Sequence, residues 1–327
     1  MTKNNRFLGT DNCSLSCTFA PRLIMGQLKQ KQSDFWYHVA AFAMILVWGI
    51  SFLNTRVLLD AGLTPTEIFV ARFTIAYLSL LVISRFKVRF TGWRDELLFV
   101  VCGVAGGSAY FIAENTALEL TLISDVAVLV SIAPLTTALM GAIFYRDERI
   151  SLLTGVGMVI AFVGSVMLAL KDGLVWGDSV LGDLLAMLAA LVWAFYSMAL
   201  KRLNRTYSTL FITRKLFFYG VLSALPLLAL EDSELSLETL KQPAVWGNLL
   251  YLGLVCSMAA YFIWGITVKR IGAVRASNYF YLSPIISMIA AAIWFGERTN
   301  AVAYVGCVLI LAGVIMAEKF KRNPVNQ

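Results

Sequence analysis

The stretch of sequence that decides the fold occurs twice. It reads AYFIAENTALELTLISDVAVLVSIAPLTTALMGAIFYRDER from 109 to 149 and AYFIWGITVKRIGAVRASNYFYLSPIISMIAAAIWFGER from 260 to 298. Each copy opens with the same four residues and closes on Glu-Arg, and Pro134 and Pro284 follow the first alanine by 25 and 24 residues. The flanks match in the same order: Leu46-Val47-Trp48 with Leu191-Val192-Trp193, Phe69 and Arg72 with Phe211 and Arg214, and Gly157 and Gly164 with Gly306 and Gly313. An ordered series of this kind indicates an internal duplication.

The composition around the duplication is that of a membrane protein. Hydrophobic residues make up 59% of the 327 residues and charged residues 14%, and the mean hydropathy is +0.75. Long runs without Asp, Glu, Lys or Arg recur along the chain, and most are long enough for the roughly 20 helical residues that cross a bilayer. These features exclude a water-soluble domain and predict an all-α integral membrane protein.

The apolar runs predict ten transmembrane helices, near 36–57, 65–84, 96–116, 121–144, 151–170, 181–200, 208–230, 246–268, 276–295 and 300–317. Each half of the duplication holds five of them. Because five is odd, the second half enters the membrane from the opposite side, so the repeats are inverted. The predicted organisation is a disordered cytoplasmic tail (1–34), a first five-helix repeat (35–170), a linker (171–180), a second repeat (181–317) and a cytoplasmic tail (318–327).

Lys and Arg are distributed unevenly between the two sets of loops. With a cytoplasmic amino terminus, 20 of the 27 basic residues lie on the inside, 4 on the outside and 3 within the spans. Basic residues are retained on the cytoplasmic side of membrane proteins, so both termini are predicted to be cytoplasmic. The net charge of +7 therefore reflects orientation and gives no reason to expect a nucleic-acid partner.

The ordered motifs resemble the EamA-type members of the drug/metabolite transporter superfamily over residues 36–317. The resemblance is carried by Trp48-Gly49 with Asn54, by Ala117-Leu118, by the block from Pro134 to Asp147-Glu148-Arg149, and by its echo from Pro284 to Gly296-Glu297-Arg298 with Gly306 and Gly313. It implies a secondary carrier, commonly an exporter of amino acids or related metabolites, in the bacterial cytoplasmic (inner) membrane. It also implies no nucleotide-hydrolysing part and leaves homodimer formation open. The second half departs from the pattern, with Trp193-Ala194 where the first has Trp48-Gly49.

Ionisable side chains inside spans are costly and normally face a bundle interior or a cavity. Arg72 and Arg214, with Lys215 beside it, are therefore candidates for attracting a carboxylate-bearing substrate, or else are snorkelling or structurally paired cations. Tyr110 and Glu114 are four residues apart and share one helix face. Glu114 either exchanges a coupled proton or is locked to Arg72 as a structural brace.

Aromatic and amide side chains complete the predicted site. Aromatic rings supply apolar walls with polar tips, and an amide in a span requires a partner. The predicted substrate-binding residues are Trp48, Asn54, Arg72, Tyr110, Glu114, Trp193, Tyr196, Arg214, Tyr261, Asn278 and Tyr281. Pro134 and Pro284 are expected to free a helical carbonyl and to act mechanically, while Glu148 and Glu297 are expected to bracket helix ends at a gate.

Other functional classes are weaker interpretations. His38 is the single histidine, no C-x-x-C pair occurs, and G-x-S-x-G, H-E-x-x-H and P-loop motifs are missing from the sequence, so no enzyme, metal site or cofactor is predicted. A lipid translocase or a non-transport membrane scaffold remains as the alternative. The sequence identifies neither the substrate nor the coupling ion.

Overall fold

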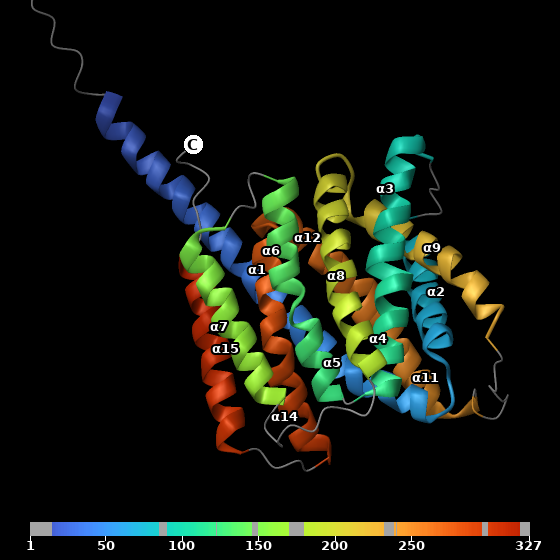
Figure 1. The fold of residues 1–327 in the computed structure, drawn as a ribbon. Helices are drawn as coiled ribbons and strands as arrows, with labels where there is room; N and C mark the ends of the chain where they lie inside the picture. Colours follow the sequence, from blue (N-terminus) through green and yellow to red (C-terminus); the bar gives the residue numbers. More distant parts are fainter. Residues whose placement is uncertain are drawn as a thin grey trace, which may run out of the picture.

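The computed structural model describes residues 15–84, 90–121, 123–145, 150–169, 180–231, 239, 241–295 and 300–320, and in this part of the chain all regular structure is helical. The first half contains α1 (Leu15–Asp60), α2 (Pro65–Ile83), α3 (Trp93–Gly103), η1 (Val104–Ser108), α4 (Ala109–Leu120), α5 (Ile123–Val130), α6 (Ala133–Phe144) and α7 (Leu152–Ala169). The second half contains α8 (Val180–Leu203), α9 (Thr209–Leu228), α11 (Pro243–Leu250), η4 (Tyr251–Ala259), α12 (Ala260–Ile271), α13 (Ala273–Ser277), η5 (Asn278–Leu282), α14 (Ser283–Phe295) and α15 (Ala301–Lys319) (Figure 1).

Eight helical segments among the described residues are long and apolar enough to cross a membrane. They are Phe35–Asp60, Pro65–Ile83, Trp93–Leu120, Asp125–Phe144, Val180–Leu203, Thr209–Leu228, Pro243–Ile271 and Ala301–Lys319. The remaining predicted spans, 151–170 and 276–295, hold the shorter helices α7 and α14. The helix of the first span begins at Leu15, within the segment that the sequence assigns to a disordered tail, whereas its apolar part begins at Phe35.

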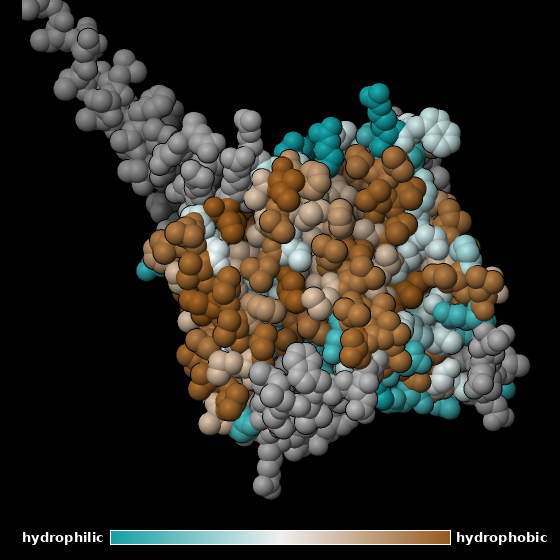
Figure 2. Space-filling view, viewed as in Figure 1, coloured by the Kyte–Doolittle hydropathy of each residue, from teal (hydrophilic) through white to brown (hydrophobic). Residues whose placement is uncertain are grey.

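The surface matches the apolar composition of these helices. Figure 2 shows a broad band of hydrophobic residues across the middle of the molecule, with hydrophilic residues gathered at its two ends. Large apolar side chains are exposed on the helices, such as Val82, Ile143 and Val308, which are 64 to 65% exposed. An outward apolar surface of this extent is typical of a protein that contacts lipid.

Local chemistry at the start of α2 shows how a helix end is fixed at the membrane border. Thr64 and Glu67 form a capping box, and Pro65 occupies the first turn, where its missing N–H costs nothing. The hydroxyls of Thr64 and Thr66 donate to Glu231 after α9, at 2.7 and 2.5 Å. These contacts hold α2 beside the end of α9.

Two long helices change to wider π-helical turns at corresponding places in the two halves. η1 ends at Ser108 and η4 ends at Ala259, so each π-helical segment is followed at once by the repeated Ala-Tyr-Phe-Ile motif. π-helical turns inside helices are frequent at functional sites. They set the direction in which Tyr110 and Tyr261 leave their helices.

The two prolines begin helices instead of kinking them. Pro134 lies in the first turn of α6, after a break that follows α5, and Pro284 lies in the first turn of α14, directly after the 3₁₀ segment η5. A proline in the first turn sacrifices no helical hydrogen bond. The interruption at each proline is therefore a break between two helices and larger than a kink, and the mechanical role of Pro134 and Pro284 stays a prediction. Glu148 and Glu297, the predicted gate residues, lie outside the described residues.

The matched glycines of α7 and α15 bring these two helices into backbone contact. A Cβ atom on Gly157 would lie 2.6 Å from the backbone nitrogen of Ala317, and one on Gly164 would lie 2.7 Å from the carbonyl oxygen of Gly306. Small residues permit this approach in membrane helices. The small-residue faces of α7 and α15 thus pack on each other within one chain.

A candidate central binding cavity

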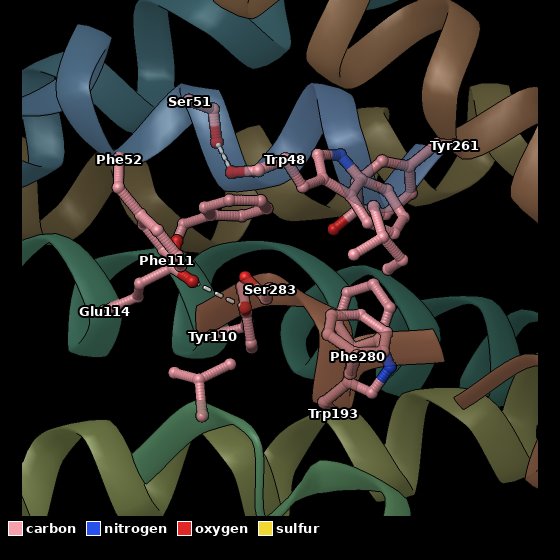
Figure 3. A pocket seen from close by; sticks show the side chains of 12 residues that line it. Trp48, Ser51, Phe52, Tyr110, Phe111, Glu114, Trp193, Tyr261, Phe280 and Ser283 are labelled. Carbon is pink, nitrogen blue, oxygen red and sulfur yellow. Dashed lines mark hydrogen bonds between the residues drawn. The ribbon is translucent and has the colours of Figure 1, made fainter. Parts of the chain in front are cut away.

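A small cavity lies at the centre of the bundle, between residues of both halves. The first half contributes α1, α4 and α5, and the second half contributes α8, α12 and the η5–α14 junction (Figure 3). The lining residues are mostly aromatic or aliphatic, with two serines and one acid: Ile45, Trp48, Ser51, Phe52, Tyr110, Phe111, Glu114, Val130, Trp193, Tyr261, Phe280 and Ser283.

Trp48 is the residue around which the aromatic rings gather. Its ring centroid lies 5.7 Å from that of Trp193 and 5.8 Å from that of Tyr261, both edge to face, and 5.8 Å from the stacked ring of Phe280. Its indole Nε1 donates to the carbonyl oxygen of Cys256 at 2.9 Å. Cys256 belongs to the π-helical segment η4, so this bond holds the Trp48 ring of α1 against η4.

Glu114 is the acidic residue of the cavity lining. Its carboxylate is 5% exposed and accepts a hydrogen bond of 2.5 Å from the hydroxyl of Tyr110, one helical turn before it (Figure 3). The indole N–H of Trp193 has no hydrogen-bond acceptor among the described residues. The cavity therefore offers a carboxyl group and an unused donor within apolar walls.

Arg72 lies behind the cavity wall and not in it. Its Nε donates to the hydroxyl of Ser257 at 3.0 Å, and its guanidinium carbon lies 4.2 Å from the centre of the Phe111 ring. Its Nη2 has no partner in the described part of the chain, and no ion pair joins it to Glu114 there. Arg72 thus adds positive charge close to the cavity without neutralising Glu114 through contact.

The other predicted residues fall into three groups. Tyr196 backs the cavity, because its ring packs 4.8 Å from that of Trp193. Asn278 and Tyr281 are buried near the η5 segment, and each has a side-chain oxygen without a hydrogen-bond partner among the described residues. Asn54 is engaged elsewhere, donating to Asn248 at 2.5 Å.

Arg214 lies in a separate cavity, described below, where its Nη1 donates to the hydroxyl of Ser84 at 2.7 Å. Five of the residues predicted to bind substrate line the central cavity: Trp48, Tyr110, Glu114, Trp193 and Tyr261. The two arginines do not share the cavity with them.

Seven lining residues were not predicted from the sequence: Ile45, Ser51, Phe52, Phe111, Val130, Phe280 and Ser283. One signal was available, because Ile45, Trp48 and Phe52 follow the spacing of one helix face. No such signal existed for Phe280 and Ser283, which stand where the chain passes from η5 into α14. A 3₁₀ segment has three residues per turn, so helical periodicity does not carry across this junction.

The free space in the cavity is about 20 Å³, which is room for roughly one water molecule. The rings of Trp48, Trp193 and Phe280 line this space. The free volume is too small for an amino acid unless the walls move apart.

A known protein family matches this chain twice, once in each half. The EamA-like transporter family matches residues 35–170 and again residues 180–318. The chain belongs to this family. This EamA-like protein is an integral membrane protein of the drug/metabolite transporter type, and its bacterial relatives support placement in the inner membrane.

Its relatives are named as transporters. A "Probable terminal-alkyne amino-acid exporter" of Streptantibioticus cattleyicolor is 28% identical over 86% of this chain and 93% of its own length. A "Probable amino-acid metabolite efflux pump" of Escherichia coli K12 is 25% identical over 84% of this chain and 92% of its own length. A crystal structure with 18% identity and a TM-score of 0.69 covers 90% of this chain and 99% of that one, which shows the shared fold. These names indicate small-metabolite transporters rather than enzymes.

Proposed function

We propose that this EamA-like protein exports an amino acid or a related small metabolite by alternating access between two inverted five-helix repeats. The observation that carries the proposal is that both halves supply walls to one closed cavity that contains a carboxylate. Transporters of inverted-repeat construction bind substrate at the interface of the repeats near the bilayer midplane. In this proposal the two repeats, residues 35–170 and 181–317, rock about the cavity and are joined by the linker 171–180. Residues 1–34 and 318–327 are the terminal tails.

Several features support ten crossings and an inverted arrangement. α1 starts from one end of the bundle and α8 from the other, while α15 finishes at the end where α1 enters (Figure 1). His38 Nε2 near the start of the first span lies 3.7 Å from Glu318 Oε1 near the end of the last. The family matches the chain twice, once in each half.

The chemistry of the cavity favours a substrate with an ammonium group. Aromatic faces attract cations, and Glu114 offers a carboxylate that receives one hydrogen bond, from Tyr110. The unused indole N–H of Trp193 suits a carboxylate at the other end of the molecule. An amino acid carries both groups, and the relatives named above are designated as amino-acid exporters or efflux pumps. Glu114 is also the group through which we expect a proton to be coupled to transport.

The proposal is tested with purified protein in lipid vesicles preloaded with unlabelled amino acids and supplied with labelled ones. We expect exchange that depends on the protein and is stopped by Val130→Trp, which fills the cavity from a buried lining position. The matched control is Leu139→Trp, at a position 63% exposed on α6. Equal exchange by both variants, or failure of the wild type to exchange any of a full amino-acid panel, would count against the proposal.

Topology is tested separately, with single cysteines introduced at Gly177 and Gln327 in a chain whose other cysteines are replaced. Five crossings separate the two sites in the proposed arrangement, so an impermeant thiol reagent should reach Gln327→Cys from the cytoplasm and Gly177→Cys from outside. Labelling of both from one compartment would overturn the inverted arrangement while leaving the question of substrate open.

A further inference from the structure

A second cavity lies on the outer side of α9, away from the central one. Phe217 of α9 points inward, with its ring 5.6 Å from that of Tyr261, while the neighbouring Phe218 is 43% exposed and lines the second cavity. The second cavity has a volume of about 140 Å³ and is enclosed by α2, α9 and the start of α3. It is thus larger than the central cavity, and two of its lining rings, Phe90 and Phe218, are exposed.

The charges in this cavity do not cancel. Lys215 pairs with Glu96, and that carboxylate also accepts hydrogen bonds from Tyr219 at 2.5 Å and from the backbone N–H of Thr91 at 2.9 Å. Arg214 is 4% exposed and has no carboxylate partner in the part of the chain that the structure describes. One guanidinium charge therefore remains in the cavity.

Arg214 is also only partly used as a hydrogen-bond donor. Among the described residues its one hydrogen bond runs from Nη1 to Ser84, although a guanidinium carries five N–H donors in a planar fork that suits phosphate. Tyr77 of α2 adds a hydroxyl-bearing ring to the same lining. The cavity therefore has the chemistry of an anion site with a preference for oxygen acceptors.

The depth and surroundings of the site identify the kind of anion. Arg214 lies five residues after Thr209, the first residue of α9, which is about 8 Å along a helix axis and suits the headgroup border. Leu78 and Val82 of α2 and Leu222 of α9 are 49 to 64% exposed beside it. An anion carrying long apolar chains would fill both parts of this surface.

We propose that this cavity binds the phosphate headgroup of an anionic phospholipid from the cytoplasmic leaflet, with Arg214 as the principal donor. Basic pockets between helices on the cytoplasmic side hold anionic headgroups, and α9 begins at the face that carries Lys201 and Arg202. The acyl chains lie along Leu78, Val82 and Leu222. Lys215 and Glu96 form the neutral floor of the site. This proposal does not depend on the identity of the transported metabolite.

The test uses the purified full-length protein in nanodiscs of equal parts phosphatidylcholine and phosphatidylglycerol. After release into mild detergent, native mass spectrometry counts the lipids of each kind that stay bound. We expect the wild type to retain phosphatidylglycerol in preference to phosphatidylcholine, and Arg214→Gln to reduce that preference about fivefold, as for the loss of one cationic contact with an anionic surface. Arg214→Lys should keep most of it.

The matched control is Arg202→Gln, which removes an exposed cation from the last turn of α8 and should leave the preference unchanged. Equal retention of both lipids by the wild type would overturn the proposal without any variant. So would an Arg214→Gln protein that retains as much phosphatidylglycerol as the wild type. Displacement of the lipid by millimolar inorganic phosphate would reassign the site to a soluble anion.

Discussion

Replacing Glu114 with glutamine tests the central claim about substrate chemistry. The variant keeps the size of the side chain and an oxygen that can accept the 2.5 Å hydrogen bond from Tyr110, but it removes the negative charge from the cavity lining. Hydrogen bonds to charged groups contribute about 1.5 to 3 kcal/mol. Loss of such a bond to a substrate ammonium group should therefore raise Kd by roughly 10- to 150-fold.

The binding assay can use the protein's own fluorescence, because Trp48 and Trp193 line the cavity. Titration of detergent-solubilised protein with amino acids gives Kd for the wild type and for Glu114→Gln. Tyr110→Phe is the matched control, since it removes a neighbouring hydroxyl but leaves the carboxylate, and we expect a smaller change. The reasoning is refuted if Glu114→Gln binds as tightly as the wild type, or if an analogue without the amino group binds equally well.

Three further substitutions test the packing around the site by thermal or denaturant unfolding in detergent. Gly157→Ala should lower the free energy of unfolding by about 1 to 3 kcal/mol, because its Cβ would lie 2.6 Å from a backbone nitrogen of α15. The control is Gly155→Ala, whose Cβ meets no atom closer than 3.6 Å and which should leave the free energy of unfolding unchanged. Lys215→Met should lower the free energy of unfolding by about 3 to 5 kcal/mol, because it leaves the buried Glu96 carboxylate without its cation. Adding Glu96→Gln should recover most of this loss. A double variant no more stable than Lys215→Met would contradict the pairing. Trp48→Phe removes the hydrogen bond to η4 and should lower the free energy of unfolding by about 0.5 to 1.5 kcal/mol. An unchanged free energy of unfolding would show that this bond does not stabilise the fold.

The sequence predicted the residues of the cavity best where the duplication supplied a second constraint. Trp48 and Trp193 occupy matched positions, as do Tyr110 and Tyr261, and all four converge on one cavity. Glu114 followed from its place one turn after Tyr110. Matched positions of a duplicated sequence can meet where its two halves pack together, so a pattern of pairs carries three-dimensional information that single apolar runs lack.

The positions of the charged residues relative to the central cavity could not be read from the sequence, for a different reason. Whether an intramembrane cation faces a cavity depends on which helix packs beside it, and neither Ser257 beside Arg72 nor Ser84 beside Arg214 is near it in sequence. Glu96, the partner of Lys215, is 119 residues away. Pairs of this kind become visible only after the helices are packed, because no local periodicity links their members.

The interruptions in the helices indicate where the cavity opens. Tyr110 and Tyr261 follow π-helical turns, Val130 ends α5 just before a break, and Phe280 lies in a 3₁₀ segment. Such segments have fewer regular backbone hydrogen bonds to lose, so they bend at lower cost than continuous helix. α7 and α15, by contrast, are continuous and interlocked through glycine contacts to backbone atoms, which leaves little room for sliding. We therefore expect opening to move the interrupted helices that carry the cavity walls, while α7 and α15 stay together as a fixed pair.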